Sequence, residues 1–329
     1  MKKNTYKKIL TALLPCMLLS MLCLGGCSGK QEPVSKTGFL FDTVVTITLY
    51  GSDRDQEELL EECFRKGEAY EQLFSRTIET SEISRINQAK GEPVTVSDDT
   101  RELIEKGLYY SELSGGAFDI TIAPVSSLWD FKSADPSVPD ADAISRAVQA
   151  VDYHTVHIDG NQVWLENPDA ALDLGGIAKG FIADRLKEFL VSNGVSSGII
   201  NLGGNVLTIG QKPDGSDYVI GIQYPFKEQN EVIDTVQIAD SSMVSSGVYE
   251  RYFYEGDTLY HHILDPKTGY PYENSLLGVT ILSSDSVDGD GLSTTCFALG
   301  LEKGTELIRS LDGIEAIFIT DDYKLHHVR

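Results

Sequence analysis

Apolar and polar residues alternate along the chain with two different periods. Residues 43–50 form a β-branched run in which apolar and polar side chains take turns, and Gly51 ends it, which predicts a strand. Residues 55–74 place apolar side chains three and four positions apart, the spacing of an amphipathic helix. A second helix is expected over residues 98–114, with Ser97 as its N-cap, because a Ser side chain can accept from the free N–H groups of the first turn.

The rest of the chain mixes helices and strands in the same way. A short helix is expected over residues 141–151, an amphipathic helix over residues 178–190, and a last helix that begins near Asp290. Strands are expected around Trp164 and over residues 198–202, 206–209, 218–223, 235–238, 251–254, 277–282 and 316–319. This mixture predicts one α+β domain, with mixed or antiparallel sheets and flanking helices.

The first 26 residues are typical of a targeting segment rather than of a folded element. Four lysines and an apolar run over residues 9–22 precede Leu24-Gly25-Gly26-Cys27, which resembles the bacterial lipobox. We therefore expect a lipoprotein signal peptide over residues 1–26, a lipidated Cys27 with a tether that ends at residue 37, and a folded domain over residues 38–329. A plain signal peptide or an N-terminal membrane helix is the alternative, although the run is short for a membrane span.

Lipidation of Cys27 would decide where the protein resides. Acyl chains such as palmitate contribute about 0.8 kcal/mol for each buried CH2 group, so two or more chains would hold the protein on a membrane without a spanning helix. We therefore expect a lipid-anchored protein on the extracytoplasmic side of the cell membrane.

The balance of charge limits the partners. The chain has 27 basic and 50 acidic residues, a net charge of −23. Because the targeting segment contributes four lysines and no acid, the part that follows it carries a charge of −27. A protein that binds a phosphate backbone through a general positive field is therefore excluded, and we expect no nucleic-acid partner.

Only two cysteines remain in the expected folded domain, Cys63 and Cys296. Two thiols cannot form a disulfide framework or a thiolate metal site. Both lie in apolar helical patterns, so we expect two small buried side chains rather than a disulfide.

Three glycine-bearing segments carry candidate chemistry, because glycine allows the backbone to approach a ligand closely. The first, residues 173–180, is a strand end that runs into a helix N-terminus. Free N–H groups there and the charge of Lys179 suit an anion such as a diphosphate. Its spacing matches neither a Walker A loop nor Gly-x-Gly-x-x-Gly, and a tight strand-to-helix turn explains the glycines equally well.

The second segment, residues 288–295, contains Asp290 and Thr294. Residues four apart share one face of a helix, so a carboxylate and a hydroxyl would lie side by side there. Oxygen ligands of this kind suit Mg2+ or Ca2+. N-capping by Asp290 is the simpler explanation of the same residues.

The third segment, residues 260–271, joins two histidines, His261 and His262, to an Asp-Pro-Lys-Thr-Gly turn. A histidine at a strand end can act as a base or a ligand, although a purely structural hydrogen bond is the commoner case. Zinc is not expected, because two further ligands at suitable spacing are lacking.

Together with four other motifs, these segments resemble the ApbE-type flavin transferases. The other motifs are Phe41-Asp42-Thr43-Val44-Val45, Ser81-Glu82-Ile83-Ser84-Arg85-Ile86-Asn87, Gly116-Ala117-Phe118-Asp119-Ile120-Thr121 and Ser245-Ser246-Gly247-Val248-Tyr249-Glu250-Arg251. The motifs follow the order of that family from about Gly38 to the C-terminus. The resemblance implies a single catalytic domain related to the T-fold. It also implies an enzyme that takes FAD as substrate, transfers its FMN moiety to a Thr or Ser hydroxyl of another protein, and releases AMP.

The resemblance further implies site residues at matching positions. The expected contacts with FAD are Phe41, Thr77, Ala117, Phe118, Asp119, Asp173, Lys179, His261 and His262. The expected metal ligands are the carbonyl of Gly176 and the side chains of Asp290 and Thr294, with Mg2+ as the metal and Mn2+ as the alternative. Two positions depart from the family pattern, since Phe41-Asp42 replaces Met-Gly and Thr77 replaces a Tyr or Asn.

The implied reaction needs charge neutralisation and a base. Asp290 is a catalytic candidate because a metal that it holds would polarise the phosphorus. His262 is the leading general-base candidate, since the ordinary pKa of histidine, about 6.5, lies close to the working pH; Asp265 or another carboxylate is the alternative. By analogy with the family, the acceptors are extracytoplasmic subunits of redox complexes or other exported flavoproteins.

Two other functions fit the same residues. A metal-dependent FAD pyrophosphatase would use water as the nucleophile and release FMN and AMP. A non-catalytic FAD-binding lipoprotein would bind the dinucleotide and release neither.

Overall fold

The computed structural model of the protein describes residues 32–52, 54–228 and 231–329, and residues 33–329 form one compact unit. Cys27 and the predicted signal peptide lie outside the described residues. Among the described residues, no helix combines the length and the apolar character needed to cross a membrane.

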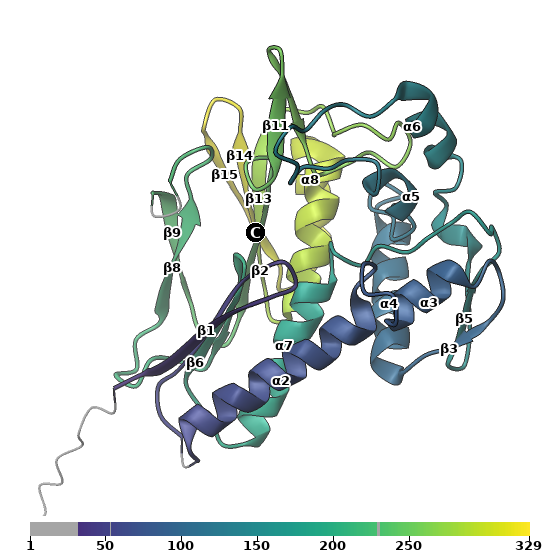
Figure 1. Cartoon of the computed structure of the whole chain (residues 1–329). Helices are drawn as coiled ribbons and strands as arrows, with labels where there is room; N and C mark the ends of the chain where they lie inside the picture. Colours follow the sequence, from purple (N-terminus) through teal and green to yellow (C-terminus); the bar gives the residue numbers. More distant parts are fainter. Residues whose placement is uncertain (1–31, 53, 229–230) are drawn as a thin grey trace, which may run out of the picture. The chain divides into compact units, whose positions relative to one another are not determined.

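Helices and strands alternate along the unit (Figure 1). The helices are α2 (Gln56–Phe74), α3 (Glu82–Gln88), α4 (Asp98–Leu113), α5 (Ala123–Ser126), α6 (Ala141–Val148), the 3-10 helix η2 (Tyr153–Thr155), α7 (Ala178–Ser192) and α8 (Ser286–Arg309). The strands are β1 (Val34–Leu40), β2 (Thr43–Leu49), β3 (Val94–Thr95), β4 (Val156–Asp159), β5 (Gln162–Leu165), β6 (Gly198–Leu202), β7 (Asn205–Ile209), β8 (Tyr218–Gln223), β9 (Val232–Ile238), β10 (Ser242–Gly247), β11 (Tyr252–Glu255), β12 (Thr258–His261), β13 (Leu276–Ser283), β14 (Glu315–Thr320) and β15 (Leu325–Val328).

The main sheet has eight strands in the order β1-β2-β6-β7-β10-β13-β14-β15, and every neighbouring pair in it is antiparallel. Helices α7 and α8 pack on one face of this sheet, and the β8–β9 hairpin lies on the other (Figure 1). The α+β fold class predicted from the sequence is therefore confirmed.

Apolar side chains fill both sides of the sheet. The largest cluster joins the sheet to α2, α4, α7 and α8, and it contains fully buried residues such as Ile47, Leu186 and Phe297. A separate cluster around Trp129 packs α5 and α6 against the β11–β12 hairpin. Burial of this kind stabilises each layer by about 25 cal/mol for every Å² of apolar surface removed from water.

Two boundaries differ from the sequence prediction. Strand β1 begins at Val34, within the expected tether, and pairs along its whole length with β2. The last helix begins at Ser286 rather than near Asp290, so Asp290 lies inside the helix and does not cap it. The first-turn N–H groups of Ser286 and Val287 instead donate to the carboxylate of Asp184 on α7, at 2.7 and 2.8 Å.

The turn between β1 and β2 has an unusual backbone. Phe41 and Asp42 both adopt positive φ, at 53° and 64°. A two-residue hairpin loop favours positive φ at both positions because this matches the twist of the strands, but the conformation is unfavourable for a bulky residue such as Phe. The Phe41 N–H donates to Glu71 Oε1 at 2.9 Å, so α2 holds the turn in place.

The cysteine prediction is confirmed. Cys63 and Cys296 are free and fully buried, and burial raises the pKa of each thiol to about 12.

Candidate functional site

The site is built where α7 crosses α8. The backbone N–H of Gly180 donates to Asp290 Oδ2 at 2.6 Å, and Asp290 is only 4% exposed. The crossing requires glycine at this position, because a Cβ atom on residue 180 would lie 2.2 Å from the carbonyl oxygen of Ser286. The helices can therefore approach closely enough for a backbone group to contact a carboxylate.

The same contact caps α7. Gly180 lies in the first turn of α7, where backbone N–H groups have no acceptor within the helix, and Asp290 accepts from it. Gly176 precedes the helix, and its carbonyl accepts no hydrogen bond from any residue that the structure describes. The hydroxyl of Thr294 follows Asp290 by one helical turn and lies 3.3 Å from Ser246 Oγ.

These three groups fit a divalent cation. A carboxylate, a hydroxyl and a free carbonyl are hard oxygen donors, the set that Mg2+ prefers. Residues 32–52, 54–228 and 231–329 contain no group of three or more His, Cys, Asp or Glu side chains that could hold a metal. A site for a hard cation here therefore depends on the carbonyl and the hydroxyl as well as on Asp290.

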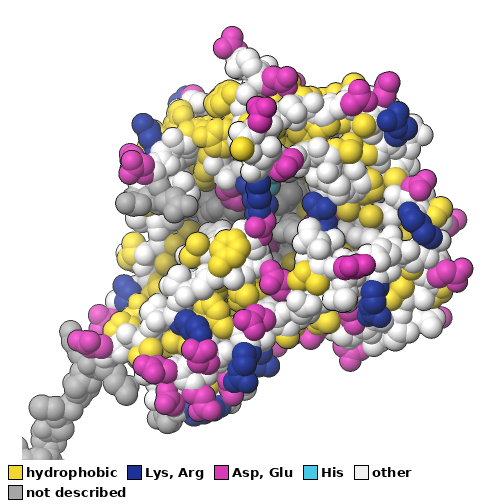
Figure 2. All heavy atoms as spheres, viewed as in Figure 1, with side chains coloured by type: hydrophobic (Ala, Val, Ile, Leu, Met, Phe, Trp, Pro, Cys, Tyr) yellow, Lys and Arg dark blue, Asp and Glu magenta, His cyan; other side chains and the backbone are white. Residues whose placement is uncertain are grey.

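Charged side chains lie beside Asp290. The ammonium group of Lys179 lies 3.6 Å from Asp290 Oδ1. Part of Glu250 is exposed to solvent. Burial by the surrounding protein nevertheless raises the pKa of its carboxyl to about 7, while the charges of Lys179 and Arg251 lower it. The face seen in Figure 2 is hollowed near its centre, with acidic and basic side chains around the hollow.

The Ala117-Phe118-Asp119 segment lies beside the same crossing. A Cβ atom on Gly176 would be 3.0 Å from Phe118 Cε2, so the Phe118 ring packs directly on the glycine. Asp119 is buried and accepts from the N–H and hydroxyl of Thr121 and from the N–H of Tyr153, at 2.8, 2.6 and 3.1 Å. Burial raises the pKa of Asp119 against the effect of these hydrogen bonds. Its carboxylate therefore holds the loop that carries Phe118.

Asp173 fixes the turn before α7. Its carboxylate accepts from the Gly175 N–H at 3.0 Å, from the Ser126 hydroxyl at 2.9 Å and from Arg76 Nε at 2.9 Å. A carboxylate has about four acceptor positions, so one remains for a ligand. The exposed Thr77 follows Arg76 in the chain, and its N–H donates to Ser75 Oγ at 3.2 Å.

The Phe41 ring packs on α2, 3.7 Å from the position of a Cβ atom on Gly67. Its contact with FAD stays a prediction. In the same turn, Asp42 pairs with Lys132. Burial and, to a smaller extent, the charge of Arg251 lower the pKa of Lys132.

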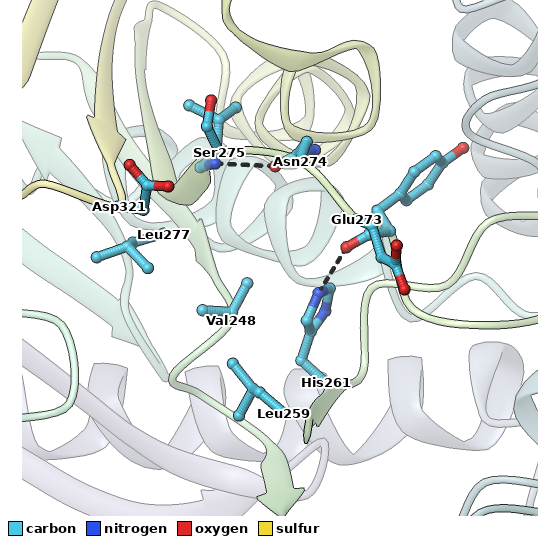
Figure 3. A pocket seen from close by; sticks show the side chains of 10 residues that line it. Val248, Leu259, His261, Glu273, Asn274, Ser275, Leu277 and Asp321 are labelled. Atoms are coloured by element: carbon cyan, nitrogen blue, oxygen red, sulfur yellow. Dashed lines mark hydrogen bonds between the residues drawn. The ribbon is translucent and has the colours of Figure 1, made fainter. Parts of the chain in front are cut away.

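The two adjacent histidines have different surroundings, because His261 is the last residue of β12 and His262 follows it. His261 is 5% exposed; its Nε2 donates to the Tyr272 carbonyl at 3.1 Å and its Nδ1 accepts from the Ile263 N–H at 3.3 Å. It lines a separate open pocket of about 480 Å³ with Leu259 and Glu273 (Figure 3). Both ring nitrogens of His261 are therefore occupied within the protein, and its contact with FAD stays a prediction.

His262 has the free nitrogen. Its Nδ1 is buried and has no hydrogen-bond partner among the described residues. Burial lowers the pKa of His262 to about 3, and the positive charge of Arg251 adds to this effect. The ordinary pKa assumed from the sequence does not hold in this structure, and the imidazole is neutral at pH 7.

Sequence reasoning gave no role to three residues around the site. Glu250 and Arg251 belong to the Ser-Ser-Gly-Val-Tyr-Glu-Arg motif, so their place in that motif was the available signal. Asp184 caps α8 from α7, a contact across 102 residues that no local pattern indicates.

Fold and site together define a class of protein: a single α+β domain in which two crossing helices bring a buried carboxylate beside a lysine. Residues 41–318 match the model of the ApbE family. A FAD:protein FMN transferase of Klebsiella pneumoniae is 38% identical over 289 residues, which cover 87% of this chain and 89% of the relative. The chain therefore belongs to the ApbE family, and the resemblance seen in the sequence is confirmed.

Two further relatives agree with this membership. A FAD:protein FMN transferase of Treponema pallidum is 33% identical over 94% of this chain and 91% of the relative. The crystal structure of the ApbE protein of Thermotoga maritima superposes with a TM-score of 0.84 at 29% identity, covering 91% of this chain and 97% of the other.

Proposed function

We propose that this protein is an FAD:protein FMN transferase that attaches the FMN moiety of FAD to a Thr or Ser hydroxyl of an exported acceptor protein and releases AMP. Relatives with this name cover nearly the whole chain. The observation that carries the proposal is the helix crossing, where the Gly180 N–H at the start of α7 donates to the buried carboxylate of Asp290, beside Lys179.

Asp290, Thr294 and the Gly176 carbonyl are the residues that would hold Mg2+, with Mn2+ as the alternative. When bound there, the cation would neutralise charge on the diphosphate and polarise the phosphorus. Asp290 Oδ2 stays with Gly180, so Oδ1 is the oxygen that faces the ligand and Lys179. The positive N-terminus of α7 and Lys179 would bind the diphosphate from the same side.

The transfer exchanges one phosphorus–oxygen bond for another. The acceptor hydroxyl oxygen attacks the phosphorus on the riboflavin side, and a phosphoester bond forms. The anhydride bond breaks, its electron pair leaves on the phosphate of AMP, and the hydroxyl proton passes to a base. His262 is the first candidate, because its Nδ1 is free and the negative diphosphate would raise the pKa that burial lowers. Glu250 is the second.

The test combines two measurements on one reaction. The chain from Ser28 onward is incubated with FAD, Mg2+ and a Thr-containing acceptor, while AMP release and acceptor mass are followed together. We expect AMP and flavinylated acceptor in equal amounts, and both lost on removal of Mg2+ with a chelator. Thr294→Val should reduce the rate at least about tenfold, since it removes a ligand. Thr295→Val is the matched control, because the Thr295 hydroxyl has no partner among the described residues.

Each alternative predicts a different outcome. Free FMN and AMP without flavinylated acceptor would identify a pyrophosphatase. FAD binding with no AMP from the unaltered protein would identify a flavin-binding lipoprotein and contradict the transferase.

We further propose that the protein acts outside the cytoplasm, anchored to the membrane by a lipid on Cys27. The lipobox supports this location, and exported flavoproteins or subunits of redox complexes are then the accessible acceptors.

A further inference from the structure

Arg251 and His262 are neighbours at the open end of the β11–β12 hairpin. The last pair of the register joins Tyr252 to His261, and the next residue on each side is Arg251 and His262. The His262 N–H donates to the Arg251 carbonyl at 3.1 Å, which holds the two residues side by side.

The guanidinium of Arg251 is exposed and forms no ion pair or side-chain hydrogen bond with any residue that the structure describes. Two other basic side chains near Arg251 already have carboxylate partners. Lys179 lies 3.6 Å from Asp290, and Lys132 pairs with Asp42. In a chain with a net charge of −23, an arginine without a carboxylate partner leaves its charge for a ligand.

The surroundings of Arg251 place its charge at the site. It is close enough to His262, Lys132 and Glu250 to lower the pKa of each of these groups. The charges of Lys179 and Asp290 also change the pKa of Glu250. Arg251 on the hairpin and these two residues at the helix crossing therefore act on the same carboxyl group.

We propose that Arg251 binds the diphosphate of FAD from the hairpin side, as Lys179 does from α7. A planar guanidinium donates two parallel hydrogen bonds and matches the geometry of a phosphate better than an ammonium group does. With Lys179 bound on one side and Arg251 on the other, the diphosphate would place its riboflavin-side phosphorus beside His262. The inference rests on the proposed function and names a further ligand-binding residue for that site.

The test compares three flavins that differ in phosphate content. Equilibrium binding of FAD, FMN and riboflavin is measured with Mg2+ present for the unaltered protein, Arg251→Ala and Arg251→Lys. We expect Arg251→Ala to weaken FAD binding at least about tenfold while riboflavin binding is unchanged, and Arg251→Lys to restore part of the loss. Arg309→Ala is the matched control, since Arg309 is exposed at the far end of α8.

The transfer reaction gives a second readout. Arg251→Ala should raise KM for FAD and leave KM for the acceptor unchanged. An equal loss for all three flavins would indicate a structural role and overturn the proposal, as would unchanged FAD binding or a rise confined to the acceptor KM. If the unaltered protein binds FAD but yields no AMP, the proposed function fails, while the binding series still decides the role of Arg251.

Discussion

Asp184 shows how one side chain without a recognisable motif supports the site. Its carboxylate on α7 accepts hydrogen bonds from two backbone N–H groups in the first turn of α8. Such bonds are normally accepted by the side chain of the residue that directly precedes a helix. The same carboxylate is largely withdrawn from water, which raises its pKa to about 7 even though both hydrogen bonds favour the charged form. The cap therefore carries an electrostatic cost near neutral pH.

The pH dependence of stability should reveal this cost. The folded-state pKa of Asp184 is about 7 and the ordinary value is 3.8, so the folded protein binds more protons than the unfolded chain between these values. Asp184 therefore lowers stability as the pH rises through this window, by at most about 1.4 kcal/mol per pH unit. Urea unfolding at several pH values should show that, as the pH rises from about 4 to 7, the free energy of unfolding of Asp184→Asn increases relative to that of the unaltered protein. A pH-independent difference would contradict the raised pKa.

At the scale of elements, the α7–α8 crossing combines stability with function. Gly180 allows the two backbones to meet, Asp290 accepts its N–H, and Asp184 closes the start of α8 one helical turn further along α7. The ligand-binding oxygens are therefore positioned by helix packing rather than by a loop. A change that separates the helices should damage both the fold and the site.

Gly180→Ala tests this coupling. The added Cβ atom would lie 2.2 Å from the Ser286 carbonyl, and backbone must move to relieve the overlap. We expect a loss of about 2 kcal/mol or more in the free energy of unfolding, together with weaker FAD binding. Val191→Ala on the exposed face of α7 is the control and should change stability by less than about 0.5 kcal/mol. Equal stability of the two variants would contradict a tight crossing.

At the scale of the whole molecule, the sequence predicts the elements better than their assembly. Alternation located β2, apolar and β-branched runs located β6 and β13, and helical spacing located α2, because these signals are local. Strand β1 was assigned to the tether, since Ser35 and Lys36 give it the composition of a linker, and only its pairing with β2 makes it a strand. The resemblance supplied the site residues, Gly176 among them, but the contact of Gly180 with Asp290 joins residues 110 apart, and no local sequence pattern indicates it.

The proposed lipid anchor on Cys27 can be tested in the full chain. Cys27→Ser in the full chain should move the protein from the membrane fraction to the soluble fraction of bacterial cells and abolish palmitate labelling, because the acyl chains supply the membrane affinity. Unfolding of the unit over residues 33–329 should be unchanged. Cys16→Ser is the control, and membrane retention of the Cys27→Ser variant would argue against a lipid anchor.

Gly180 and Asp290, which meet at the helix crossing, are 110 residues apart in the chain. Contacts of such long range form only after the intervening chain has been organised. An incomplete chain, or one still being assembled, therefore offers no place for the dinucleotide. Capture of FAD would report that maturation has finished, and the fluorescence of the flavin could time the final step of refolding.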